Sequence, residues 1–158
     1  MHRNNFIAYF LTLACFIILA PSLASAQSDK VKLAMADLKA MAGELGAPKL
    51  QGNDLYFGND KADNSIVDAV VKKDGGAATL FAKNGDQFVR VASTVKKEDG
   101  SSAVGTALDP KSPAFAKLSA GEPYYGDATV FGEAYDAGYE PIKDASGVAG
   151  AYFVGYPK

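Results

Sequence analysis

The sequence predicts an α+β domain in which a long N-terminal helix packs on a five-stranded antiparallel sheet. Two observations carry this prediction: apolar residues first recur at helical spacing, and five strand-like segments then follow, joined mostly by short turns. Strands connected by tight turns pair in antiparallel fashion, and the apolar face of the resulting sheet is buried against the helix.

Residues 1–26 have the organisation of a cleavable signal peptide. A short basic stretch precedes an apolar run over residues 6–20. Ala24 and Ala26 supply the small residues that a signal peptidase reads, so we expect cleavage before Gln27. The apolar run is shorter than the roughly 20 residues that cross a bilayer. An uncleaved anchor is the alternative interpretation, and a freely diffusing periplasmic protein is the expectation.

The predicted mature chain, residues 27–158, is long enough for one domain with its own core. Its net charge of −3 and the lack of a basic stripe argue against nucleic acid as a partner. Cys15 and His2 are the only cysteine and histidine, and both belong to the signal peptide. The mature chain therefore has no disulfide, no zinc site built on Cys or His, and no Ser–His or Cys–His nucleophile pair. We expect neither an enzyme nor a bound cofactor.

The first helix is predicted from its apolar stripe, with Ser28 or Asp29 as its cap and Gly46 at its end. The stripe consists of Val31, Met35, Leu38, Met41 and Leu45. A second helix is expected over residues 64–73, capped by Asp63 and stopped by the glycines that follow. Its buried face would be Ile66, Val67, Val70 and Val71.

The remaining elements are strands and one short helix. Asn84-Gly85 predicts a hairpin because both residues tolerate positive φ, and Ser112 followed by Pro113 predicts a helix over residues 113–119. Turns are expected at 132–133 and 144–147. The predicted strands are residues 77–82, 88–95, 124–131, 134–142 and 149–155.

Two motifs that suggest chemistry do not fit their context. Ser93 and Lys96 match the Ser-x-x-Lys pattern of penicillin-recognising enzymes, but they lie in a strand and face opposite ways. Asp60, Asp63 and Asp68 lack the spacing and the glycine of a calcium loop. We interpret them as a solvated loop with a helix cap.

Arg90 is the only arginine of the predicted mature chain, beside fourteen lysines, and it interrupts an apolar strand. Its planar guanidinium suits a two-point contact with a carboxylate. That carboxylate could belong to a ligand or to an internal salt bridge, and the sequence leaves both interpretations open.

Four tyrosines lie within sixteen residues, on strands that are expected to be neighbours: Tyr124, Tyr125, Tyr135 and Tyr139. Tyr135 and Tyr139 project to one face of their strand. Tyrosines provide apolar walls with hydroxyl tips, which are typical of pockets for small polar ligands. Ordinary packing of aromatic residues in a sheet is the alternative.

Several segments, in this order, resemble single-Cache extracytoplasmic sensor domains of the Cache 3/Cache 2 fusion type, found in methyl-accepting chemotaxis receptors and sensor kinases. The resemblance covers about residues 55–158. The segments are 88–94 (FVRVAST), 96–100 (KKEDG), 104–110 (VGTALDP), 121–128 (GEPYYGDA), 139–144 (YEPIKD) and 154–158 (VGYPK).

The resemblance implies a PAS-like fold with a small-molecule pocket on the side of the sheet that faces away from the long helix. It implies small carboxylates, amino acids or other metabolites as ligands. It also implies which residues of this chain lie near the pocket. Lys143 and Thr79 are the weaker candidates. The main candidates are Arg90, Tyr124, Tyr125, Tyr135 and Tyr139.

Receptors of this type continue into a transmembrane helix and a signalling module, whereas this sequence ends at Lys158. We therefore expect a stand-alone sensor domain without signalling output of its own. A membrane receptor or kinase is a candidate partner, and the first helix, with Val31, is a candidate homodimer contact. The alternative is a structural or protein-interaction module whose pocket is filled by side chains.

Overall fold

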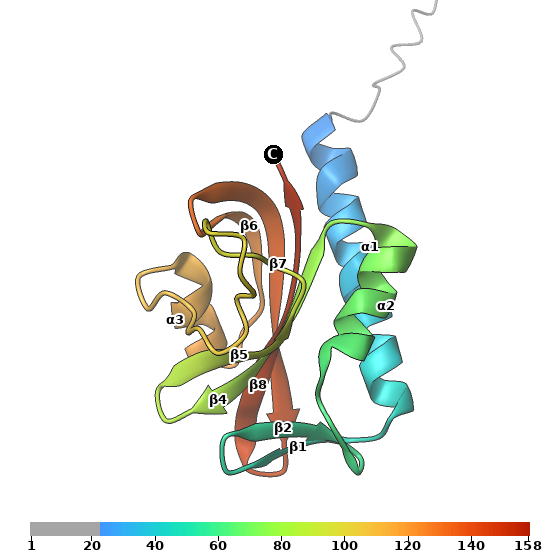
Figure 1. Cartoon of the computed structure of the whole chain (residues 1–158), viewed down its shortest axis with the longest axis vertical. Helices are drawn as coiled ribbons and strands as arrows, with labels where there is room; N and C mark the ends of the chain where they lie inside the picture. Colours follow the sequence, from blue (N-terminus) through green and yellow to red (C-terminus); the bar gives the residue numbers. More distant parts are fainter. Residues whose placement is uncertain (1–22) are drawn as a thin grey trace, which may run out of the picture.

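A computed structural model describes residues 23–158 as two layers of helix around one sheet (Figure 1). Helices α1 (Leu23–Glu44) and α2 (Asn64–Asp74) cover one face of the sheet. The short helix α3 (Pro113–Ser119) and the long segment before it cover the other face. None of the helices in this part of the chain is both long and apolar enough to cross a membrane.

The central sheet has five antiparallel strands in the order β5-β4-β8-β7-β6. The predicted α+β class, with an N-terminal helix packed on a five-stranded antiparallel sheet, is confirmed. The strands are β4 (Ala77–Asn84), β5 (Gln87–Ser93), β6 (Tyr124–Val130), β7 (Glu133–Asp144) and β8 (Gly147–Pro157).

Helix α1 buries Val31, Met35 and Leu38 of the predicted stripe, whereas Met41 is only partly buried. Leu45 is 40% exposed because the helix ends at Glu44, one residue earlier. The helix is already formed at Leu23, so neither Ser28 nor Asp29 starts it, contrary to the prediction; the alanines and lysines around them have high helix propensity. The fully buried positions are Val31, Ala34, Met35, Leu38 and Ala42.

Three short strands that the sequence did not suggest form a second, small sheet beside the helices. They are β1 (Pro48–Gln51), β2 (Asp54–Phe57) and β3 (Asp60–Lys61). Leu55 and Phe57 of β2 are buried in the core under α1 and α2. Strands of two to four residues are too short to show a clear alternation, which explains why the pattern was missed.

The predicted caps of α2 and α3 are both confirmed. Asp63 Oδ1 accepts a hydrogen bond of 2.8 Å from the backbone N–H of Ser65 at the start of α2. Ser112 Oγ accepts one of 3.2 Å from the N–H of Phe115 at the start of α3. These bonds satisfy amide groups that have no partner within the helix.

Two predicted turns are shifted by one residue. The pairs Asn84↔Gln87 and Val130↔Glu133 close two-residue turns at Gly85–Asp86 and at Phe131–Gly132. The second turn is unexpected because Phe131 has φ 48°, a conformation that side chains other than Asn, Asp or Gly rarely adopt.

The sheet separates two apolar cores. The first lies under α1 and α2 and includes Leu38, Phe57 and Leu80. The second lies on the α3 side and includes Phe81, Phe88 and Phe153. The second core borders a cavity that is lined partly by its own residues, among them Leu108 and Tyr139.

Candidate functional site

A cavity of about 620 Å³ lies on the face of the sheet away from α1. It is bounded by strands β5, β6 and β7, by the start of α3 with the segment that precedes it, and by the β6–β7 turn. Most of its wall is apolar. The charged side chains that line it are Arg90, Asp109, Asp127 and Lys158.

A bulge in β5 makes Arg90 and Ala92, two residues apart, face opposite sides of the sheet. Arg90 pairs with Phe81 and Ala92 pairs with Leu80, so Val91 is an extra residue on this strand. Bulges of this kind redirect neighbouring side chains. Arg90 thereby shares the cavity face with Phe81, while Ala92 joins the core under α1.

The guanidinium of Arg90 is held along one edge and unpaired along another. Nη1 donates hydrogen bonds of 3.0 Å to Thr106 Oγ1 and of 3.0 Å to the carbonyl oxygen of Ala107. Nε is buried without a hydrogen-bond partner among the described residues. The whole residue is 5% exposed. Burying a donor without a partner is costly, so the unpaired Nε indicates a donor whose hydrogen-bond acceptor is not among the described residues.

The charge of Arg90 is also uncompensated. None of the ion pairs within residues 23–158 involves Arg90, so the internal salt bridge considered from the sequence is absent from this part of the chain. The rings of Phe81 and Phe131 lie against the guanidinium, with centroids 4.9 and 5.1 Å from Cζ. Burial lowers the pKa of Arg90 from its ordinary value, although a guanidinium remains charged in proteins.

Three of the predicted tyrosines line the cavity. Tyr124 donates a 2.7 Å hydrogen bond to the carbonyl oxygen of Asp127, and Tyr135 donates one of 3.0 Å to Glu133 Oε2. Tyr139 is 1% exposed, and its hydroxyl makes no hydrogen bond to any described residue. Burial raises the pKa of Tyr139, and it raises that of Tyr135 to about 12, so both hydroxyls are neutral donors at neutral pH.

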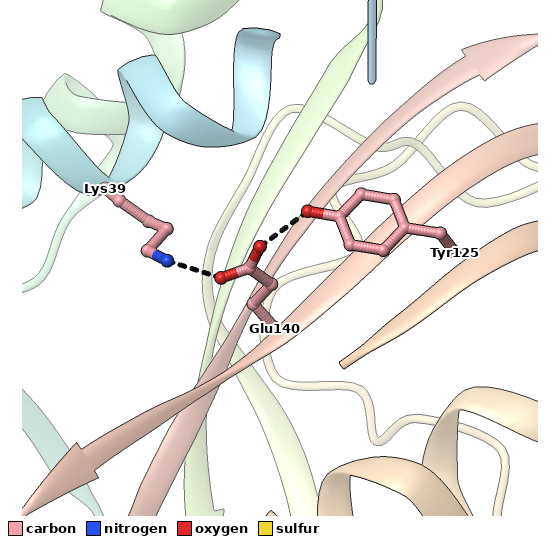
Figure 2. Close-up of polar contacts among 3 residues, drawn as sticks. All are labelled: Lys39, Tyr125 and Glu140. Atoms are coloured by element: carbon pink, nitrogen blue, oxygen red, sulfur yellow. Dashed lines mark hydrogen bonds and ion pairs between the residues drawn. The ribbon is translucent and has the colours of Figure 1, made fainter. Parts of the chain in front are cut away.

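Tyr125 lies on the opposite face of the sheet. Its hydroxyl donates a 2.5 Å hydrogen bond to Glu140 Oε1, and Lys39 of α1 binds the other carboxylate oxygen (Figure 2). Burial alone would raise the pKa of Glu140, but the hydrogen bonds from Lys39 and Tyr125 outweigh it and hold this pKa below its ordinary value. These three residues join α1 to β6 and β7 and do not line the cavity.

The two weaker candidates also lie outside the cavity wall. Thr79 is fully buried on the cavity face of β4, where its hydroxyl is 2.7 Å from Ser93 Oγ. Lys143 is exposed, and the end of its side chain lies beside Gly121. Neither side chain contributes to the lining.

The structure brings further residues to the cavity that the sequence did not single out. Phe131 contacts Arg90, and Asp127 forms an ion pair with Lys158 at the rim. An aromatic residue directly before a turn glycine was the only pattern that could have pointed to Phe131. The described residues contain no group of three His, Cys, Asp or Glu side chains placed to hold a metal ion.

Comparison with known proteins gives one result. The family model of the Cache 3/Cache 2 fusion domain matches residues 22–158, which is most of the chain, whereas no curated protein matches it. Domains of this family are extracytoplasmic sensor modules that generally bind small molecules and are typically non-catalytic. The N-terminal helix and the five-stranded antiparallel sheet agree with that architecture. The chain belongs to the Cache 3/Cache 2 fusion family.

Proposed function

We propose that this chain is an exported sensor domain that binds a small anionic metabolite, such as a carboxylate or an amino acid, in the cavity beside Arg90. The observation that carries the proposal is the guanidinium itself, which is buried at the cavity with an unpaired Nε and no carboxylate partner among the described residues. An anion bound there would compensate the charge and complete the hydrogen bonds.

The tyrosines have supporting roles in this proposal. Tyr139, whose hydroxyl has no partner among the described residues, donates to the anion, while Tyr124 and Tyr135 form the walls. The volume of about 620 Å³ favours binding over the alternative of a structural module with a filled pocket.

Calorimetric titration tests the role of Arg90. A thermal-shift screen of carboxylates and amino acids first identifies a ligand, since a ligand at 100 times its dissociation constant adds about 2.7 kcal/mol of stability. Loss of a charge-assisted hydrogen bond should then weaken binding about ten- to a hundred-fold in Arg90→Ala, and Arg90→Lys should recover part of it.

Lys72→Ala is the matched control, because it removes one positive charge from the exposed surface of α2, on the other side of the sheet. It should bind like the wild type. If Arg90→Ala also keeps wild-type affinity while its unliganded melting temperature falls, Arg90 is a structural residue and the proposal fails.

Export and output are part of the same proposal. The signal peptide over residues 1–26 falls almost entirely outside the described residues, and its removal before Gln27 is tested by the intact mass of the periplasmic protein.

A membrane receptor or kinase would read the ligand state. Val31 is buried within the chain, so a homodimer through α1 would use exposed positions such as Leu33, which is 61% exposed.

A further inference from the structure

The turn between β6 and β7 holds a strained residue against the candidate ligand site. Phe131 and Gly132 both have positive φ, 48° and 84°, as a two-residue turn of this hand requires. Asn or Gly is the usual first residue of such a turn, and a phenylalanine there is strained. Backbone strain that persists in a fold is a reason to look for a function of that residue.

The ring of Phe131 lies on the one buried guanidinium of the site. Its centroid is 5.1 Å from Arg90 Cζ, and the ring of Phe81 lies 4.9 Å from the same atom. With Nη1 bound to Thr106 and Ala107, the polar surface left to a ligand is the edge formed by Nε and Nη2. Nε has almost no accessible surface while the two rings are in place.

A second cavity gives this ring room to move. It measures about 440 Å³, is bounded by residues 94–98 and β7, and shares Phe131 and Tyr135 with the Arg90 cavity. Phe131 is therefore part of the wall between two spaces. A rotation of its side chain toward the second cavity would uncover Arg90 without any change in the strands.

We infer that Phe131 is a specificity-determining residue that covers Arg90 and admits anions with a flat charged group in preference to tetrahedral ones. This inference rests on the proposed function of Arg90 as the anion contact. A carboxylate is flat and can approach the free edge of the guanidinium in its own plane, with both ring centroids within 5.1 Å of Cζ. A sulfonate or phosphate has oxygens on both sides of that plane, and these would meet the rings.

The cover can be tested without any ligand, because Arg90 is the only arginine outside the predicted signal peptide. Butanedione modifies accessible arginines, and peptide mass spectrometry follows the rate at Arg90. We expect modification about ten times faster in Phe131→Asn. Butanedione reacts when Arg90 becomes accessible, and loss of one cation–aromatic contact makes this local opening more frequent. Asn suits the turn, so the urea midpoint should not fall. Phe131→Tyr keeps the ring and should react like the wild type.

The selectivity is tested with acetate and methanesulfonate, which carry the same charge on a flat and on a tetrahedral group. Each is titrated as a protectant of Arg90 against butanedione. In the wild type, acetate should protect at about a tenfold lower concentration, the size of effect expected for one unfavourable contact, and this ratio should largely disappear in Phe131→Asn. Phe131→Tyr should restore it.

The outcomes separate this inference from the proposed function. Equal modification rates in wild type and Phe131→Asn would refute the cover, and equal protection by the two anions in wild type would refute the selectivity. Faster modification of Phe131→Asn, with no protection by either anion in any variant, would leave Phe131 as a cover but refute both the selectivity and Arg90 as an anion contact.

Discussion

At the scale of single residues, neighbours in the same strand serve opposite faces of the sheet. Tyr139 lines the cavity, whereas Glu140 binds Lys39 and Tyr125 on the α1 side (Figure 2). The same alternation separates Tyr124 from Tyr125 in β6. Successive side chains of a strand point to opposite faces, so the hydroxyls of Tyr124 and Tyr125, adjacent in the sequence, have different surroundings.

We therefore expect Tyr139→Phe to weaken ligand binding without loss of stability, and Tyr125→Phe to lower stability without loss of binding. Tyr139 makes no hydrogen bond to the described residues, so its change to Phe should alter the free energy of unfolding by less than about 0.5 kcal/mol, while affinity for a screened ligand falls about tenfold. Tyr125→Phe removes the bond to Glu140 and should cost about 1 kcal/mol of stability with affinity unchanged.

Urea unfolding and calorimetric titration of both variants check this prediction. Loss of stability in Tyr139→Phe, with unchanged affinity, would mean that the Tyr139 hydroxyl serves the fold rather than the ligand.

The sequence could predict part of this site. Arg90 and Tyr139 were identified because a lone arginine in an apolar strand and a tyrosine-rich pair of strands are both visible in the sequence. The grouping of Tyr124 with Tyr125 ignored the alternation of faces, which the sequence does contain. Phe131 could not be predicted, because its place depends on a turn whose backbone conformation is unfavourable for phenylalanine.

At the scale of elements, two carboxylates lie close together where α1 meets α2. Asp37 of α1 forms a 2.8 Å ion pair with Lys73, and Asp74 lies beside them at the C-terminal end of α2. The hydrogen bond from Lys73 lowers the pKa of Asp37, whereas burial and the charge of Asp37 raise the pKa of Asp74. The surroundings therefore favour the ionised form of Asp37 and disfavour the ionised form of Asp74.

We predict that Asp74→Asn stabilises the protein at pH 7. A carboxyl group whose pKa is raised by folding favours the folded state below its unfolded pKa of about 3.9, and that contribution is lost as pH rises through the folded pKa. Removing the charge from the end of α2 should add about 0.3–1 kcal/mol at pH 7 and little at pH 3.

Asp37→Asn is the control, and it should have the opposite sign at pH 7 because it removes the partner of Lys73. Urea unfolding of the two variants at both pH values measures the effect. A destabilised Asp74→Asn at pH 7 would show that its charge is favourable where it lies.

The elements also show what sequence patterns can resolve. The helices with clear caps, α2 and α3, were predicted to within one residue at each end, because Asp63 and Ser112 each mark a starting point. The start of α1 and the three strands of the small sheet were missed. Ser28 and Asp29 are acceptable inside a helix, and strands of four residues or fewer carry too little periodicity.

At the scale of the whole molecule, the fold follows from consistent local patterns. Antiparallel strands joined by two-residue turns pair with their neighbours in sequence, so the class and the hairpin pairings could be expected. The pairing of β4 with β8, which are far apart in the sequence, was not predicted. A pocket on the sheet face away from α1 was expected only from the family resemblance, and its volume could not be predicted, since that volume depends on the path of the segment between β5 and α3. That segment has little regular structure and is held through Arg90, Ala103 and Leu108.

The division of the apolar residues into two cores has a consequence for the evolution of this domain. One core supports α1 and α2, the other surrounds the cavity, and no buried residue belongs to both. Changes on opposite sides of a sheet with no shared partners tend to have additive effects on stability. The cavity wall can therefore change by successive substitutions, while the opposite core keeps its own contacts and its own share of the folding free energy.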